Sequence, residues 1–103
     1  MENYVNKTQA IIDLQQRGYD QDFVLTNEGI LYLQASELIR PEEFEITETY
    51  RFENSKSLND RYIIYAIRSF ENEVKGILMT SYNSFNKNIS LHLWAKLAKH
   101  LTR

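Results

Sequence analysis

Two long apolar runs separated by a short polar turn lie between Arg61 and Tyr82, and they constrain the fold more than any other stretch. Both runs are rich in β-branched and aromatic residues, which favour extended strands. Glu71-Asn72-Glu73 supplies the turn, and pairing Phe70 with Val74 would place successive side chains on alternate faces of a hairpin. Both faces would then be apolar, which is typical of strands in the middle of a sheet.

One face of this hairpin is predicted to be an interaction surface. With Phe70 opposite Val74, the odd-numbered apolar residues gather on it, and Thr47, Thr49 and Arg51 of a neighbouring strand give it a polar rim. The predicted interface residues are Ile63, Tyr65, Ile67, Ile77 and Met79. We expect both helices on the even-numbered face, so the odd face would be covered by a second copy in a homodimer. In the alternative, one helix covers the odd face and gives a monomer with a three-layer core.

The chain has 103 residues, enough for one domain spanning 1–103. It contains no cysteine, which excludes disulfides, zinc–thiolate sites and cysteine nucleophiles. No apolar run approaches the ~20 residues of a membrane span, and the N-terminus lacks the pattern of a secretory signal. We therefore expect a cytoplasmic protein that does not bind membranes. A formal net charge of −2 also argues against nucleic acid as the partner.

The order of elements predicts a two-layer α+β domain with about five mainly antiparallel strands between two helices, because short loops join successive strands. The expected helices are residues 3–17 and 91–101, and the expected early strands are 22–26, 30–34 and 44–53. Residues 35–39 fit no single element. Gly18 is placed to end the first helix, with Tyr19 folding back against its last turn. Trp94 and Leu97 are expected in the buried stripe of the last helix.

Several segments together suggest a family. They are GYDQDF at 18–23, PEEFEITETYRFE at 41–53, IIYAI at 63–67 and VKGILMTSY at 74–82. In these segments the chain resembles a family of small bacterial proteins of unknown function, some of which carry the label phosphoribosylpyrophosphate synthetase. The resemblance covers nearly the whole chain up to Ser90, and it brings no catalytic residues with it.

The sequence lacks the motifs that bind nucleotides or metal ions. Phosphate-binding loops cluster glycines, whereas Gly18, Gly29 and Gly76 lie far apart, so we do not expect the synthetase activity. His92 and His100 are eight residues apart on the expected last helix, whereas helical metal pairs are four apart. We therefore predict no catalytic residues, no cofactor and no metal site.

Glu48 is the one residue whose position suggests a site. It interrupts an alternating apolar strand in which Phe44, Ile46, Tyr50 and Phe52 share one face. A hairpin symmetric about Ser57 places Glu48 opposite Ala66 and diagonal to Arg68, which predicts a Glu48–Arg68 ion pair.

Two functions follow from these patterns. The first is a non-enzymatic interaction module that forms a homodimer through its sheet. The alternative is a small-molecule-binding protein or minor enzyme with a pocket between sheet and helices. The residues of that predicted pocket are Glu48, Arg68, Tyr50 and Tyr62.

Overall fold

The computed structural model of the chain describes residues 7–53, 61–71, 73–81 and 91–99. Within them, two α-helices and a short 3₁₀ helix accompany a six-stranded mixed sheet. The elements are α1 (Lys7–Gln16), β1 (Gln21–Leu25), β2 (Ile30–Tyr32), β3 (Glu37–Ile39), η1 (Pro41–Glu43), β4 (Phe44–Glu53), β5 (Arg61–Ser69), β6 (Lys75–Ser81) and α2 (Leu91–Lys99). The predicted α+β class is confirmed. The sheet has six strands rather than five, because residues 37–39 form β3.

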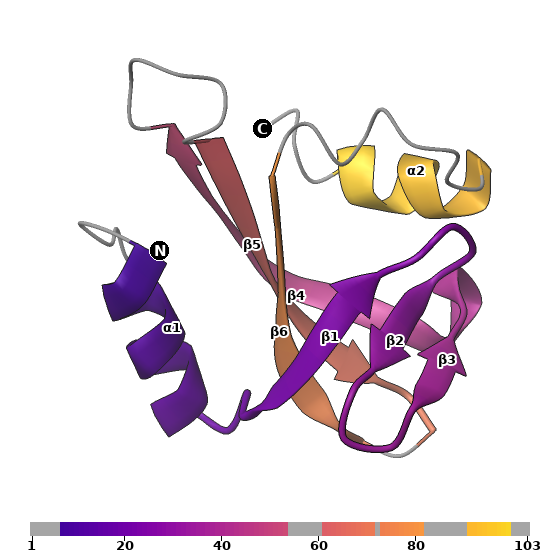
Figure 1. Ribbon diagram of the computed structural model, residues 1–103, viewed down its shortest axis with the longest axis horizontal. Helices are drawn as coiled ribbons and strands as arrows, with labels where there is room; N and C mark the ends of the chain where they lie inside the picture. The colour runs from indigo at the N-terminus through magenta and orange to yellow at the C-terminus, as the bar shows by residue number, and fades with distance from the viewer. Residues whose placement is uncertain (1–6, 54–60, 72, 82–90, 100–103) are drawn as a thin grey trace.

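The sheet consists of two antiparallel three-stranded units joined side by side (Figure 1). The strand order is β3-β2-β1-β6-β5-β4, and β1 runs parallel to β6 where the two units meet. Gly76 lies at this junction, where a Cβ would come within 2.5 Å of the Gln21 carbonyl oxygen. The close approach of the two backbones therefore depends on a residue without a side chain.

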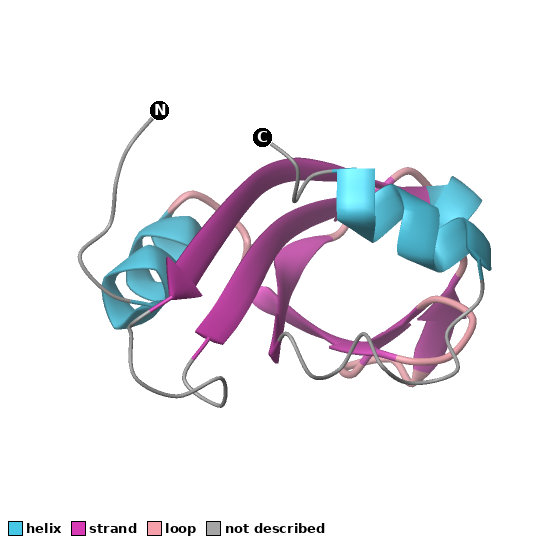
Figure 2. Cartoon of the chain, turned by 90° about the horizontal axis from the view of Figure 1, so that it is seen from above, coloured by secondary structure: helices cyan, strands magenta, loops and turns pink. Residues whose placement is uncertain are grey.

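The sheet curls, and α2 lies across the opening of the curl (Figure 2). The short η1 links the edge strands β3 and β4, so both contribute to a single core beneath α2. We call the side of the sheet that carries this core the inner face. The inner core comprises Phe23, Ile30, Ile39, Phe44, Ile46, Ile63, Tyr65, Ile67, Leu78, Leu93 and Leu97. Leu97 is buried as predicted. Leu93 is buried with it, whereas Trp94, which was expected there, is 38% exposed.

The first helix packs on the opposite side of the sheet, which we call the outer face. Ala10, Leu14 and Tyr19 form the outer core with Ile64, Ala66 and Ile77. Gly18 ends α1 with φ of 103°, and the Tyr19 amide donates to the Leu14 carbonyl at 2.9 Å, as the sequence predicted. The prediction that both helices cover the even-numbered face is wrong, because α1 and α2 lie on opposite faces.

The predicted register of the central hairpin is wrong by one residue. The Ser69 amide donates to the Val74 carbonyl at 2.8 Å, so Ser69 rather than Phe70 closes the hairpin. Ile67 then lies opposite Gly76, and Ala66 lies opposite Ile77. A shift of one residue moves every side chain of a strand to the other face.

This shift divides the predicted interface between the two faces. Ile63, Tyr65 and Ile67 are fully buried in the inner core, whereas Ile77 is buried in the outer core. Met79 lies opposite Ile64 on the outer face and is 43% exposed. The five residues therefore do not form one surface, and α2 covers the face that was expected to be open.

The predicted pairing of β4 with β5 is correct from Glu48 onward, but it is shifted by one residue before that point, where β4 has a bulge. Glu48 lies opposite Ala66 as predicted, but the register shifts between Ile46 and Glu48. Thr47 lies in this bulge, and its hydroxyl donates to the Ala66 carbonyl at 3.1 Å. The bulge places Phe44 and Ile46 in the inner core and packs Tyr50 and Phe52 against the outer core. The predicted single apolar face of β4 is therefore wrong.

Candidate functional site

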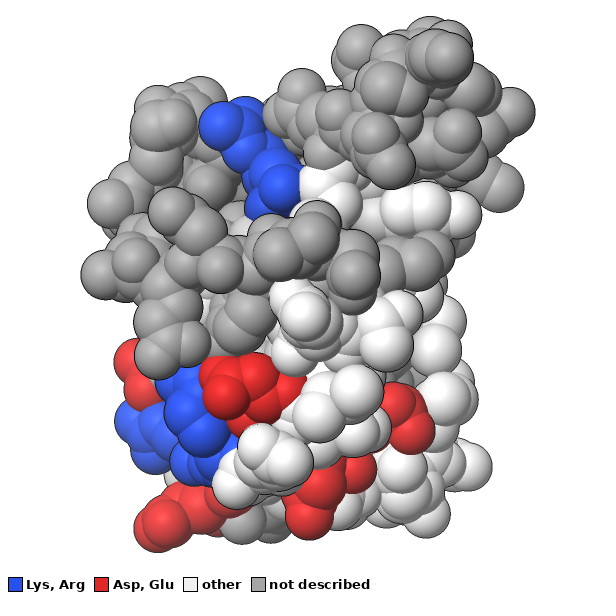
Figure 3. All heavy atoms as spheres, turned by 90° about the vertical axis from the view of Figure 1, so that its left-hand side faces the viewer, with Lys and Arg blue, Asp and Glu red and all other residues white. Residues whose placement is uncertain are grey.

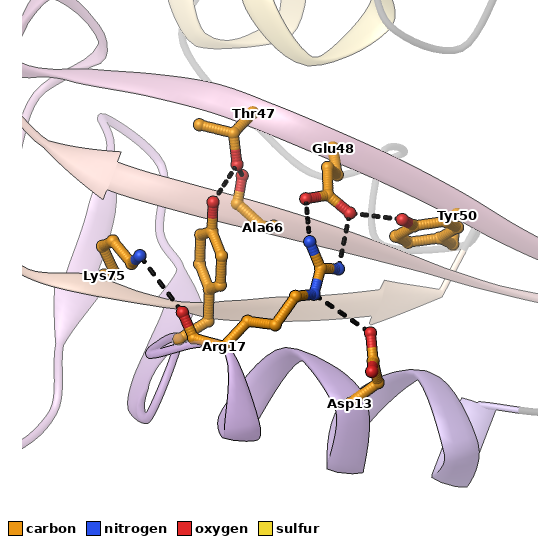
Figure 4. Close-up of polar contacts among 8 residues, drawn as sticks. Asp13, Arg17, Thr47, Glu48, Tyr50, Ala66 and Lys75 are labelled. Atoms are coloured by element: carbon orange, nitrogen blue, oxygen red, sulfur yellow. Dashed lines mark hydrogen bonds and ion pairs between the residues drawn. The ribbon is translucent and has the colours of Figure 1, made fainter. Parts of the chain in front are cut away.

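The polar centre of the outer face is an ion pair between α1 and β4 (Figure 4). The Arg17 guanidinium donates from Nη1 to Glu48 Oε2 at 2.7 Å and from Nη2 to Glu48 Oε1 at 2.8 Å. Tyr50, two residues further along the same face of β4, donates its hydroxyl to Glu48 Oε1. This bidentate geometry matches the fork of the guanidinium to both carboxylate oxygens.

The first helix orients the arginine. Asp13 precedes Arg17 by one helical turn, and its Oδ2 accepts a hydrogen bond from Arg17 Nε at 3.0 Å. Lys75 of β6 donates to the Arg17 carbonyl at 3.2 Å and lies 4.6 Å from the centre of the Tyr19 ring. These contacts fix the end of α1 against β6 as well as against β4.

The same contacts lower the pKa of Glu48. The hydrogen bond from Arg17 is the largest cause, and the Tyr50 hydroxyl and the charges of Arg17 and Lys75 act in the same direction, whereas burial opposes them. Glu48 is therefore ionised at neutral pH, with both oxygens accepting hydrogen bonds. A carboxylate held in this way stabilises the docking of α1 and is poorly suited to act as a general base.

The structure does not assemble the four predicted pocket residues into one site. Glu48 and Tyr50 are in contact, but Arg68 pairs with Glu45, directly opposite on β4, with Nη2 and Oε2 2.5 Å apart. Tyr62 lies six residues from Arg68 on the same strand, which corresponds to about 20 Å. The predicted Glu48–Arg68 pair is wrong, because each residue has another partner.

Sequence reasoning missed Arg17, the principal partner of Glu48. Its spacing of four residues from Asp13 is a recognisable helical ion pair and marks the charged side of α1. The contact with Glu48 spans 31 residues of chain and gave no local signal. Figure 3, seen from the side of α1, shows acidic and basic side chains next to one another at the lower left, with further acidic side chains among the uncharged ones to their right.

A second feature of the outer face is a row of apolar side chains across four strands. Val24 lies opposite Leu31, and Leu31 lies opposite Leu38. The parallel register of β1 and β6 places Met79 next to Val24 at the other end. We call Met79, Val24, Leu31 and Leu38 the outer apolar row. Val24, Leu38 and Met79 are 44%, 41% and 43% exposed, so the row is open to solvent.

Comparison with protein-family models, curated proteins and solved structures found no match. Across the described ranges, no three acidic or histidine side chains lie close enough together to hold a metal ion, and His92 is exposed on α2. Of the described helices, none is both long and apolar enough to cross a membrane.

Proposed function

We propose that the protein is a non-enzymatic interaction module that forms a homodimer through the outer face of its sheet. The observation that supports this proposal is the outer apolar row. Monomers seldom expose large contiguous apolar patches. The outer apolar row is contiguous because its members lie on four neighbouring strands. The surface differs from the one that the sequence predicted, since only Met79 belongs to both.

The position of α1 leaves this surface open. The helix packs on Ile64, Ala66 and Ile77, which belong to β5 and β6. Leu31 and Leu38 lie on β2 and β3, at the far end of the strand order. Leu33, which follows β2 and is 47% exposed, extends the apolar surface beyond the row. The docked helix and the open row thus occupy different parts of one face.

The alternative function, a small-molecule pocket, has less support. Its predicted residues lie along the length of the β4–β5 hairpin rather than around one space. Within that predicted pocket, Glu48 already accepts two hydrogen bonds from Arg17. Recognition of a polar ligand would have to break this pair, and we therefore favour the interaction module.

The test is the oligomeric state of the wild type and of a Leu38→Glu variant, measured by size exclusion with light scattering. A carboxylate within the outer apolar row must lose its hydration when the copies associate. We expect a wild-type dimer and a folded, monomeric variant. Ile12→Glu is the matched control, because Ile12 is an apolar side chain on α1 that is 50% exposed, and it should remain a dimer. A wild type that stays monomeric at about millimolar concentration (the range of a weak complex) would refute the proposal.

A further inference from the structure

An acidic residue lies on one side of the outer apolar row and a basic residue on the other. Asp22 precedes Val24 by two residues on β1, and its carbonyl accepts a hydrogen bond from the Leu33 amide at 3.1 Å. Arg40 follows Leu38 by two residues at the end of β3, with an extended backbone. Because side chains alternate along a strand, both residues lie on the outer face with the row. Both are exposed.

Leu31 lies midway between these two charges. Asp22 is one strand away and two residues toward one end of the sheet, and Arg40 is one strand away and two residues toward the other end. With strands ~4.8 Å apart and a rise of ~3.3 Å per residue, each charge lies about 8 Å from Leu31. The two charges are therefore arranged symmetrically about Leu31.

On the basis of the proposed homodimer, we infer that the two copies are related by a two-fold axis beside Leu31, with Asp22 of each copy against Arg40 of the other. In a two-fold interface every contact occurs twice, so one acid–base diagonal gives two equivalent ion pairs. Leu31 meets its own copy at the centre. The interface then has an apolar centre and complementary charges at its rim, which fix its orientation.

Neither charged residue is buried in the fold. Asp22 Oδ2 accepts a hydrogen bond of 3.2 Å from the exposed Gln34 side chain. Arg40 contributes to η1 through its backbone, whose amide donates to Glu43 Oε1 at 2.9 Å. Substitution of either side chain leaves the backbone bonds of β1 and η1 in place. Charge reversal at these two positions therefore tests recognition rather than folding.

The experiment is a charge exchange with Asp22→Arg and Arg40→Asp, using analytical ultracentrifugation at low salt. Each variant alone would bring like charges together twice, and we expect its dimer to weaken by about tenfold. An equimolar mixture would restore opposite charges at both contacts, so we expect a heterodimer about as tight as the wild type. The advantage of the mixture should shrink as salt is added.

The possible results distinguish an error in the inferred two-fold axis from an error in the proposed homodimer. Glu37→Arg, on the same strand as Leu38 but on the inner face, is the control and should dimerise like the wild type. If both reversed variants dimerise as tightly as the wild type, or if mixing them gives no gain, the axis is wrong and the proposed homodimer stands. If the wild type itself is a monomer, both proposals fail.

Discussion

The two faces of the sheet are stabilised in different ways. On the inner face, α2 buries Leu93 and Leu97 against a core that gathers side chains from all six strands. On the outer face, α1 buries a smaller set around Ala10 and Leu14, and the Arg17–Glu48 pair secures its end. The inner core is predominantly apolar, whereas the outer core depends on both apolar packing and a partly exposed ion pair.

The difference follows from the curl of the sheet. Figure 2 shows α2 lying across the curled strands. Side chains on the inner side of a curled sheet converge, so one short helix can close a large core over them. Side chains on the outer side diverge, and a helix there contacts a few strands only. We therefore expect the inner face to account for most of the stability, whereas the outer face keeps apolar side chains exposed to solvent.

The largest effect is expected from Ile67→Glu. Ile67 is fully buried in the inner core, and an unpaired carboxylate there should destabilise the fold by about 5 kcal/mol or more, which is comparable with the total stability of a small domain. We expect loss of cooperative thermal unfolding by circular dichroism. Leu38→Glu, the same charge on the outer apolar row, should still unfold cooperatively in dilute solution. Equal damage from both variants would show that the two faces are equally packed.

Glu48→Gln should have an intermediate effect that depends on pH. Because Arg17 is 41% exposed and Glu48 is 24% exposed, we expect a loss of about 1 kcal/mol at neutral pH in urea unfolding. The folded-state pKa of Glu48 lies below its ordinary value of 4.5, so the pair stabilises the fold above that pH, and its contribution disappears as pH falls through the folded-state pKa. The wild type and the variant should therefore converge in acid. A difference that stays constant with pH would contradict this role.

The smallest effect is expected from Glu45→Gln. Its partner Arg68 lies directly across the β4–β5 ladder, and the two side chains are 41% and 37% exposed. This pair joins strands that are already hydrogen-bonded, so we expect a change of less than about 0.5 kcal/mol. A stability loss as large as that of Glu48→Gln would mean that the Arg17–Glu48 pair stabilises the fold no more than the Arg68–Glu45 pair does.

The sequence by itself determined most of the elements, though not β3, and some of their pairing. Alternating and helical patterns correctly indicated the α+β class, the flanking helices and the end of α1 at Gly18. The position of Glu48 opposite Ala66 followed from the symmetry of the hairpin. These features depend on residues that are near in sequence or related by a single turn, and local patterns contain that information.

The tertiary structure decided which side chains share a face. Closing the β5–β6 hairpin at Ser69 and inserting the bulge at Thr47 each displaced the expected register by one residue. Side chains alternate with a period of two, so these small changes moved Ile77 and Met79 to the outer face and separated Phe44 from Tyr50. The partner of Glu48 and the face that α2 covers then depended on contacts between distant segments, which only the packed chain defines.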